Sequence, residues 1–363
     1  MSCCGCARRR PPERLTSLYP EGEPRRKALA LALLPGVGPS TYHSLTAKFG
    51  SALRAFDDAP GLRGHRTALE RADDVLAAAR DRGIWTILSD EPRYPAPLRE
   101  LADPPPCLFG LGNPALLDRP AVAIVGTRRA TPYGERVTRE LATALARAGL
   151  VVVSGMARGI DAAAHRAALD ATGATIAVLG TGVDLAYPRG HRDLHRRIAV
   201  QGLLLSEEFP GDRASPGSFP RRNRIIAGLA RATIIVEAPF RSGALITAGH
   251  ALDLHRDVAA VPGRIDDPQS AGSNELLRDG AQVIASVADA LALVGATPPV
   301  RATAAIDTPA EQAVWNALAG GALTLDALAS RSALPAPECL AAVTTLELRG
   351  AIECALTGEI RRR

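Results

Sequence analysis

The chain has 363 residues, 47% of them hydrophobic and 22% charged, and its side chains carry a net charge of +5 at neutral pH. This length is too great for one ordinary domain and predicts a large core domain flanked by one or two smaller ones. No apolar run approaches the roughly 20 residues that cross a bilayer, and no apolar stretch of a secretory signal follows the N-terminal cysteines and arginines, so we expect a cytoplasmic protein with no membrane partner.

Residues 1–24 are expected to form a disordered tail. Cys3, Cys4 and Cys6 crowd this segment, whereas the other three cysteines are scattered along the chain. A structural zinc site would need a second closely spaced pair of ligands, and the sequence offers no such pair. We therefore interpret the tail as reduced, and we predict no metal ion or other cofactor.

Residues 25–88 predict a small helical domain. The stretch KALALALLPGVGPSTYHSLTAKFGS has the form helix, tight hairpin, helix, with Gly36 and Gly38 in the hairpin. Glycine amides at the start of a helix can approach a phosphate, which is how helix-hairpin-helix modules hold nucleic acid. The same hairpin is also an ordinary corner between helices, so both interpretations stay open. Residues 89–120 are rich in proline and predict a connector that lies against the next domain.

Residues 121–295 predict the core domain. Six short β-branched runs lack polar alternation, as strands buried on both faces do. These runs are AVAIVG (121–126), LVVVSG (150–155), TIAVLG (175–180), GLLLSEE (202–208), ATIIVEA (232–238) and DVAAVPG (257–263). Helical stretches separate them, so we predict a Rossmann-like, doubly wound α/β fold with a mostly parallel sheet. Its ligand site should lie at the carboxyl ends of the strands.

The C-terminal part predicts a further small domain. Residues 296–309 are rich in proline, alanine and threonine and have the composition of a linker. Residues 310–363 have the spacing of three helices followed by a short hairpin. That pattern indicates a winged-helix-like domain.

The loops that follow the predicted strands carry glycine beside a hydroxyl group or an arginine. Glycine lets the backbone approach a ligand, the following helix N-terminus supplies partial positive charge, and arginine offers a forked donor that suits phosphate. Several such loops at one edge of the sheet would bind more than one phosphate. The candidate contacts in these loops are Arg128, Ser154, Gly155, Arg158, Gly159, Ser242 and Gly243.

Motifs of common enzymes are missing from the core domain. No GxGxxG follows the first strand, no P-loop lysine is present, and no GxSxG nucleophile elbow occurs. Glu207 and Glu208 after a strand could act as acid or base, but they could equally be caps of the strand end. The histidines show no common metal spacing, so we predict solvated or helix-packing roles for them. We therefore expect no catalytic residue.

The stretch FPRRNRIIAGLA (219–230) is the most specific in the chain. Phe219 precedes three arginines, and an exposed aromatic beside cations would offer a stacking platform for a base and partners for its phosphates. Alternatively, Phe219 fills the domain core and the arginines form a solvated helix start. Because polar residues precede Ile225 and Ile226, we expect this side of the helix start to face outward.

The motifs of the core domain, taken in order, resemble those of the DprA (Smf) family. They are IVGTR (124–128), SGMARGID (154–161), LGTGVDLAYP (179–188), FPRRNRIIAGL (219–229), VEAPFRSGALITA (236–248) and PG followed by GSNELLRDGA (262–281). The resemblance implies a protein without a catalytic step that binds and protects single-stranded DNA, forms a homodimer and helps to load a RecA-type recombinase in natural transformation. It further implies a sterile-alpha-motif-like N-terminal domain and a C-terminal winged helix.

The resemblance also implies which residues contact DNA. Matching motif positions are Arg128, Phe219, Arg222, Asn223 and Arg224, and only Arg213 is available for the basic residue that the family often has upstream of the phenylalanine. The alternative is a nucleotide-processing enzyme of the lysine-decarboxylase-like (phosphoribohydrolase) class, whose PGGxGTxxE loop holds a catalytic glutamate. Here the corresponding loop begins at Glu237 and has no glutamate after its glycine, which favours binding over hydrolysis.

Overall fold

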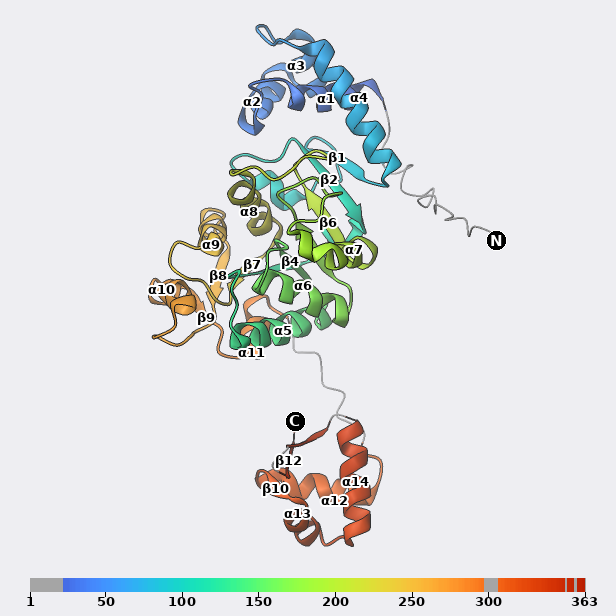
Figure 1. The fold of residues 1–363 in the computed structure, drawn as a ribbon, viewed down its shortest axis with the longest axis vertical. Coiled ribbons are helices and arrows are strands. Elements are labelled where there is room, and N and C mark those ends of the chain that lie inside the picture. Colours follow the sequence, from blue (N-terminus) through green and yellow to red (C-terminus); the bar gives the residue numbers. More distant parts are fainter. Residues whose placement is uncertain (1–21, 297–305, 350, 356–357, 363) are drawn as a thin grey trace, which may run out of the picture. The chain divides into compact units, whose positions relative to one another are not determined.

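A computed structural model describes residues 22–296, 306–349, 351–355 and 358–362 (Figure 1). Most of the predicted tail, with its three cysteines, and most of the predicted linker lie outside these residues, and α1 already begins at Glu23. The chain divides after Ala296 into two compact units. Among the described residues, none of the helices combines the length and the apolar character needed to cross a bilayer.

Four helices form the N-terminal part of the first unit: α1 (Glu23–Leu33), α2 (Pro39–Phe49), α3 (Ala52–Asp58) and α4 (His65–Asp81). Gly36 adopts a φ of 81°, which allows the sharp turn between α1 and α2. The apolar side of α1, including Leu29 and Leu31, is completely buried and belongs to a core that also contains Met156 and Leu179 of the α/β part. The predicted helical domain is therefore present and packs on the sheet.

A nine-stranded sheet forms the centre of the first unit, in the order β1-β2-β6-β5-β4-β3-β7-β8-β9. Its strands are β1 (Trp85–Leu88), β2 (Cys107–Gly112), β3 (Ala121–Val125), β4 (Val151–Ser154), β5 (Thr175–Val178), β6 (Leu203–Ser206), β7 (Ala232–Ile235), β8 (Asp257–Ala260) and β9 (Gln282–Val283). All neighbouring strands in this order from β6 through β5, β4, β3, β7 and β8 to β9 pair in parallel. All six predicted strands are present, and the doubly wound fold is confirmed.

The sheet is covered by helices on both faces (Figure 1). These helices are α5 (Pro132–Arg147), α6 (Ile160–Ala171), α7 (Arg192–Gln201), α8 (Ser218–Leu229), α9 (Gly243–Asp253), α10 (Ala271–Arg278) and α11 (Val287–Leu293). Residues of α5, α6 and α11 share one core with the strands, and residues of α8 and α9 share the core on the opposite face. The chain runs outward from β3 to β6, then returns to β7 on the other side of β3. This reversal places a crevice at the carboxyl ends of β3 and β7, where open α/β sheets bind ligands.

The proline-rich segment is more than the predicted connector. Residues 107–112 form β2, which pairs antiparallel with both β1 and β6 and extends the main sheet. Two short 3-10 helices, Ala96–Glu100 and Pro114–Asp118, flank it. Trp85 of β1 lies directly over Gly110, where a Cβ atom would come within 2.0 Å of the indole ring. Strands β1 and β2 extend the core to residues before 121, so the α/β domain begins earlier in the chain than the sequence indicated.

The second unit contains α12 (Pro309–Ala317), α13 (Leu325–Ser332) and α14 (Ala336–Leu348). A small antiparallel sheet, in the order β10-β12-β11, combines β10 (Leu323–Thr324), β11 (Ile352–Cys354) and β12 (Glu359–Arg362). Its own apolar core includes Leu328, Leu346 and Ile360. Three helices followed by a hairpin confirm the predicted winged-helix architecture.

Candidate nucleic-acid interface

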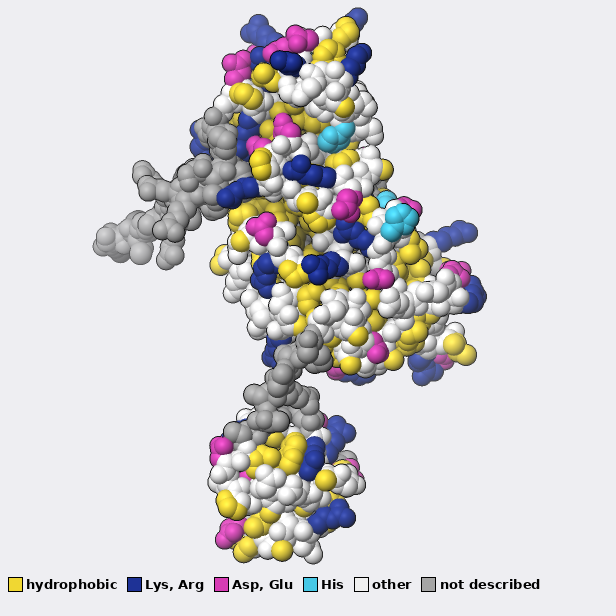
Figure 2. Space-filling model, turned by 180° about the vertical axis from the view of Figure 1, so that it is seen from behind, with side chains coloured by type: hydrophobic (Ala, Val, Ile, Leu, Met, Phe, Trp, Pro, Cys, Tyr) yellow, Lys and Arg dark blue, Asp and Glu magenta, His cyan; other side chains and the backbone are white. Residues whose placement is uncertain are grey.

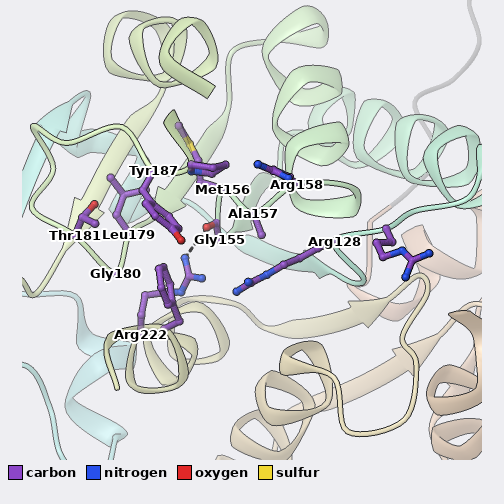
Figure 3. Close-up of a pocket in the computed structure, with 13 residues that line it drawn as sticks. Arg128, Gly155, Met156, Ala157, Arg158, Leu179, Gly180, Thr181, Tyr187 and Arg222 are labelled. Carbon is purple, nitrogen blue, oxygen red and sulfur yellow. Dashed lines mark hydrogen bonds between the residues drawn. The ribbon is translucent and has the colours of Figure 1, made fainter. Parts of the chain in front are cut away.

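Two adjoining hollows lie at the carboxyl ends of the parallel strands. The first has a volume of about 340 Å³ and is lined from the ends of β3, β4 and β5 (Figure 3). The second has a volume of about 630 Å³ and is lined by the loops after β3 and β7, at the point where the strand order reverses. Five residues line both hollows: Arg128, Arg129, Ala157, Phe219 and Arg222. The location agrees with the prediction that the ligand site follows the strand ends.

Phe219 stands between the two hollows. Its ring lies 5.1 Å from that of Tyr187, at an interplanar angle of 34°, and the guanidinium of Arg128 lies 5.7 Å from its centroid. Phe219 is half-buried rather than fully exposed, whereas Tyr187 is 46% exposed. The arrangement offers an aromatic surface with a cation beside it, and it differs from the alternative of a phenylalanine sealed in the core.

Three arginines add positive charge to the lining of the hollows. Arg128, Arg129 and Arg158 are exposed, line one or both hollows, and have no ion pair among the described residues. Figure 3 shows the side chain of Arg128 reaching across the hollow toward Arg222. Figure 2 shows basic, acidic and apolar side chains interspersed on the face that it presents. Arg128, Arg129 and Arg158 thus form, at this edge of the sheet, a local cluster of guanidinium groups without an ion pair in the part of the chain that the structure describes.

Arg222 forms the floor shared by both hollows. It is 5% exposed and donates to the carbonyl oxygens of Gly155, at 2.7 Å, and Val178. Burial lowers its pKa to about 10, against the opposing effect of Asp161, so the guanidinium stays charged at neutral pH. A Cβ atom at Gly155 would lie 2.6 Å from the guanidinium nitrogens, so any larger residue at this position would displace the guanidinium. Arg222 thus supplies buried positive charge rather than the outward-facing donor that the sequence predicted.

The neighbouring residues of α8 are also buried, contrary to the predicted outward face. Asn223 donates from Nδ2 to the carbonyl of Gly243 at 3.0 Å and so connects α8 to the start of α9. Arg224 is 4% exposed and pairs with Glu207 at 2.7 Å and Asp103 at 3.1 Å. It lines neither hollow. Arg224 therefore joins α8 to the end of β6 and to the proline-rich segment, a position that does not support the predicted DNA contact.

Three more predicted contacts lie outside the hollows. Ser154 is fully buried and donates to the carbonyl of Ile124, which ties β4 to β3. Gly159 has a φ of 71° and comes so close to the Thr127 carbonyl that a Cβ atom would lie 2.4 Å from it. Arg213 is exposed and lines neither hollow. Of these, Ser154 and Gly159 shape the site from behind.

The turn after β4 is held by a buried histidine. Met156 has a φ of 61° and donates its backbone N–H to Nε2 of His165 at 3.3 Å. The other ring nitrogen lies 2.7 Å from the hydroxyl of Thr175, which itself donates to the Val152 carbonyl. Burial lowers the pKa of His165 to about 3, so the ring is neutral and Nδ1 carries the proton. The histidine therefore packs and orients the turn, as one of the two predicted roles requires.

The second hollow ends at the N-terminus of α9. Ser242 and Gly243 line it, as the loop composition suggested, together with Thr247. Thr127 and Gln269 also line this hollow, and Thr127 donates its hydroxyl to the amide oxygen of Gln269 at 2.7 Å. Because the N-terminus of α9 borders this hollow, the positive end of its helix dipole favours a negatively charged ligand.

Glutamates in the strand-end loops bond to neighbouring residues. Glu237 is 1% exposed and accepts from the backbone N–H of Thr131 at 3.0 Å and from the Thr131 hydroxyl, which fixes the start of α5. Glu207 is paired with Arg224 and Arg221. Within the described residues, no group of three or more potential metal ligands comes together.

Sequence reasoning missed several residues that line the hollows. Tyr187, the partner of Phe219, belongs to the LGTGVDLAYP stretch after β5, which was recognised as a motif but gave no candidate. Arg129 was passed over beside Arg128, and Gln269 lies in the last of the strand-end loops. An exposed aromatic or cation in a strand-end loop is the signal that could have identified the first two.

Comparisons with known proteins cover nearly the whole described chain. The family model for DNA recombination-mediator protein A matches residues 85–295, while the DprA-like N-terminal HHH domain matches 23–78 and the DprA winged helix domain matches 297–355. A Mycobacterium tuberculosis protein assigned as DNA processing protein DprA is 43% identical over 313 residues, which is 80% of each chain. Protein Smf of Escherichia coli is 38% identical over 288 residues, covering 76% of this chain and 77% of its own.

Two solved structures are similar to this chain. DNA processing protein A from Streptococcus pneumoniae aligns with a TM-score of 0.64 and 37% identity, over 73% of this chain and 95% of that one. The protein of the same name from Helicobacter pylori, solved to explain its single-stranded DNA binding mode, aligns with a TM-score of 0.54 and 36% identity over 58% and 96%.

Proposed function

This chain belongs to the DNA processing protein A (DprA, Smf) family, and from that premise we propose that it binds single-stranded DNA across the two adjoining hollows. The observation that carries the proposal is the aromatic pair Phe219 and Tyr187 with the unpaired cation Arg128 beside it. Bases stack on such rings without regard to sequence, and arginines contact the phosphates between them.

The position of Phe219 between the two hollows favours a single strand over a duplex. Phe219 lies between the hollows, so a strand that occupies both must present an unstacked base to the ring. In duplex DNA the bases are already stacked and paired, and extruding one costs a few kcal/mol. Arg129, which lines both hollows, and Arg158, which lines the first, add to the cationic lining. An extended strand can therefore satisfy stacking and charge together, whereas a duplex satisfies charge alone.

We further propose the role that follows from such binding in this family: protection of incoming single strands and loading of a RecA-type recombinase during transformation, by a cytoplasmic homodimer. No turnover of DNA or nucleotides is expected. Support for this expectation comes from Glu237 and Glu207, which are committed to Thr131 and to arginines respectively. Release of free base from a nucleoside monophosphate, lost in Glu237→Gln, would establish the enzymatic alternative instead.

The deciding experiment is the binding of labelled oligo-dT and a matched duplex by fluorescence anisotropy across a salt titration. We expect tighter binding of the single strand at every salt concentration, and affinity that falls as salt rises. Equal affinity for the duplex throughout the titration would contradict the proposal and indicate another nucleic-acid role.

A further inference from the structure

The third helix of the winged-helix unit presents an apolar stripe to solvent. Along α14, five exposed residues recur at intervals that place them on one side of the helix: Pro337, Leu340, Ala341, Thr344 and Leu348. Leu340 is 50% exposed and Leu348 is 84% exposed. Exposed leucines two turns apart on one side of a short helix form a patch suited to protein contact rather than ordinary solvated surface.

The stripe offers no hydrogen-bond donor to a ligand. The hydroxyl of Thr344, the one polar group in the stripe, donates to the carbonyl of Leu340 at 2.9 Å, which leaves its methyl group outward. The residues that flank the stripe are acidic, Glu338 on one side and Glu347 on the other, and both are exposed. No lysine or arginine occurs within α14.

The rest of the unit does not compensate for this lack of positive charge. Residues 306–363 contain seven acidic and five basic side chains, a net charge of −2, in a chain of net charge +5. Arg349 is paired with Asp307 at 3.0 Å and Glu311 at 2.9 Å. Arg362 lies 4.3 Å from the centroid of the Trp315 ring and donates to its carbonyl. Arginines near the end of α14 and in the hairpin are thus already bound within the unit.

A helix that reads DNA needs the opposite character. Recognition helices enter the major groove and contact base edges and phosphates through donors and cations. Here the equivalent helix would bring Glu338, Glu347 and leucines toward a polyanion. The fold of the unit is that of a DNA reader, but the surface of α14 is not.

We propose that the α14 stripe binds a basic amphipathic helix of a protein partner. Leu340 and Leu348 are about 12 Å apart along the helix axis, and because Ala341 and Thr344 between them are smaller, we expect a shallow depression there. An apolar side chain of a crossing helix enters this depression, as ridges enter grooves in helix packing. Lysines or arginines that flank the partner's apolar residues pair with Glu338 and Glu347. Charge complementarity therefore selects a basic partner and disfavours nucleic acid.

The test uses the full chain and two synthetic helical peptides of equal length. Both carry leucines at i, i+3, i+4 and i+7; one is flanked by lysines and the other by glutamates. By fluorescence anisotropy we expect the lysine-flanked peptide to bind more tightly, and Leu340→Asp and Leu348→Asp each to weaken it by roughly tenfold or more. Leu252→Asp, at a 56% exposed position on α9, is the matched control and should leave binding unchanged.

A charge swap makes the test independent of the leucines. In the double variant Glu338→Lys, Glu347→Lys the preference should reverse toward the glutamate-flanked peptide, with circular dichroism confirming an unchanged helix content. Three results would overturn the proposal: equal binding of both peptides, self-association that is lost in Leu348→Asp by sedimentation velocity, or duplex DNA binding that Leu348→Asp abolishes. The second would identify another copy of the chain as the occupant, and the third would identify DNA.

Discussion

Helix α8 has two sides that use the same residue type in different ways. On the side toward the hollows, Arg222 lines the floor beneath Phe219 and donates to the carbonyl of Gly155. On the other side, Arg224 is enclosed by Glu207 and Asp103. Two arginines separated by one residue therefore divide into a ligand-facing group and a structural group. The role that each arginine takes depends on its partners, which come from distant parts of the chain.

The largest expected effect is the loss of stability in Arg224→Ala. The substitution leaves the buried carboxylate of Glu207 without its closest partner, which costs about 3 kcal/mol in comparable pairs. Urea unfolding followed by circular dichroism should show this loss, while the folded protein binds oligo-dT as tightly as the wild type. Arg231→Ala, at an exposed position just after α8, is the control and should change neither property. A stable Arg224→Ala protein with weakened DNA binding would remove the distinction between the two sides.

The sequence predicted the six central strands because β-branched runs buried on both faces lack alternation. It did not predict that β1 and β2 join the sheet, because the prolines that surround Cys107 suppress the strand signal and the packing of Trp85 on Gly110 is visible only in three dimensions.

The candidate site was predicted only in part for the same reason, because the sequence does not reveal contacts between distant residues. Arg128, Phe219, Ser242 and Gly243 were identified from local composition and motif position, and they do line the hollows. The burial of Arg222, Asn223 and Arg224 was not predictable, because polarity alone indicates exposure. Their partners, such as Gly155, Gly243 and Glu207, lie on other strand-end loops.

The next effect concerns stacking on the ligand-facing side. Phe219→Ala removes the ring on which a base would stack and should weaken oligo-dT binding by about 1–3 kcal/mol. Because no charge is lost, the dependence of affinity on salt should stay nearly unchanged. Phe219→Trp retains an aromatic surface and should bind close to wild type. Thermal melts check the alternative: a sharp fall in melting temperature with normal binding by the folded fraction would mean that Phe219 serves the core.

Charge on the same side should behave differently from stacking. Arg128→Ala removes one unpaired guanidinium, so oligo-dT binding should weaken and the slope of log affinity against log salt should fall by about 0.7 for a single strand. Arg139→Ala removes an equal charge from an exposed position on α5, outside both hollows, and should leave the slope as it is. An identical change in both variants would indicate that net charge, rather than the site, sets the salt dependence.

The smallest expected effect is that of Arg213→Ala, the position matched to the family's upstream basic residue. Arg213 is exposed and lines neither hollow. A short oligo-dT of about six nucleotides is near the lower site sizes of single-strand binders. It should bind the variant within about 0.5 kcal/mol of wild type, because surface substitutions generally have effects of this size. We expect a longer strand to extend past Phe219 along the loop that precedes α8 and to bring a phosphate within reach of this side chain. Comparing the short oligonucleotide with one of about twenty nucleotides, near the upper end of such site sizes, therefore measures where the site ends. A loss of affinity confined to the longer strand would mean that Arg213 adds one contact to the ligand-facing side of α8. An equal loss of affinity with both strands would place Arg213 within the site itself, contrary to its position.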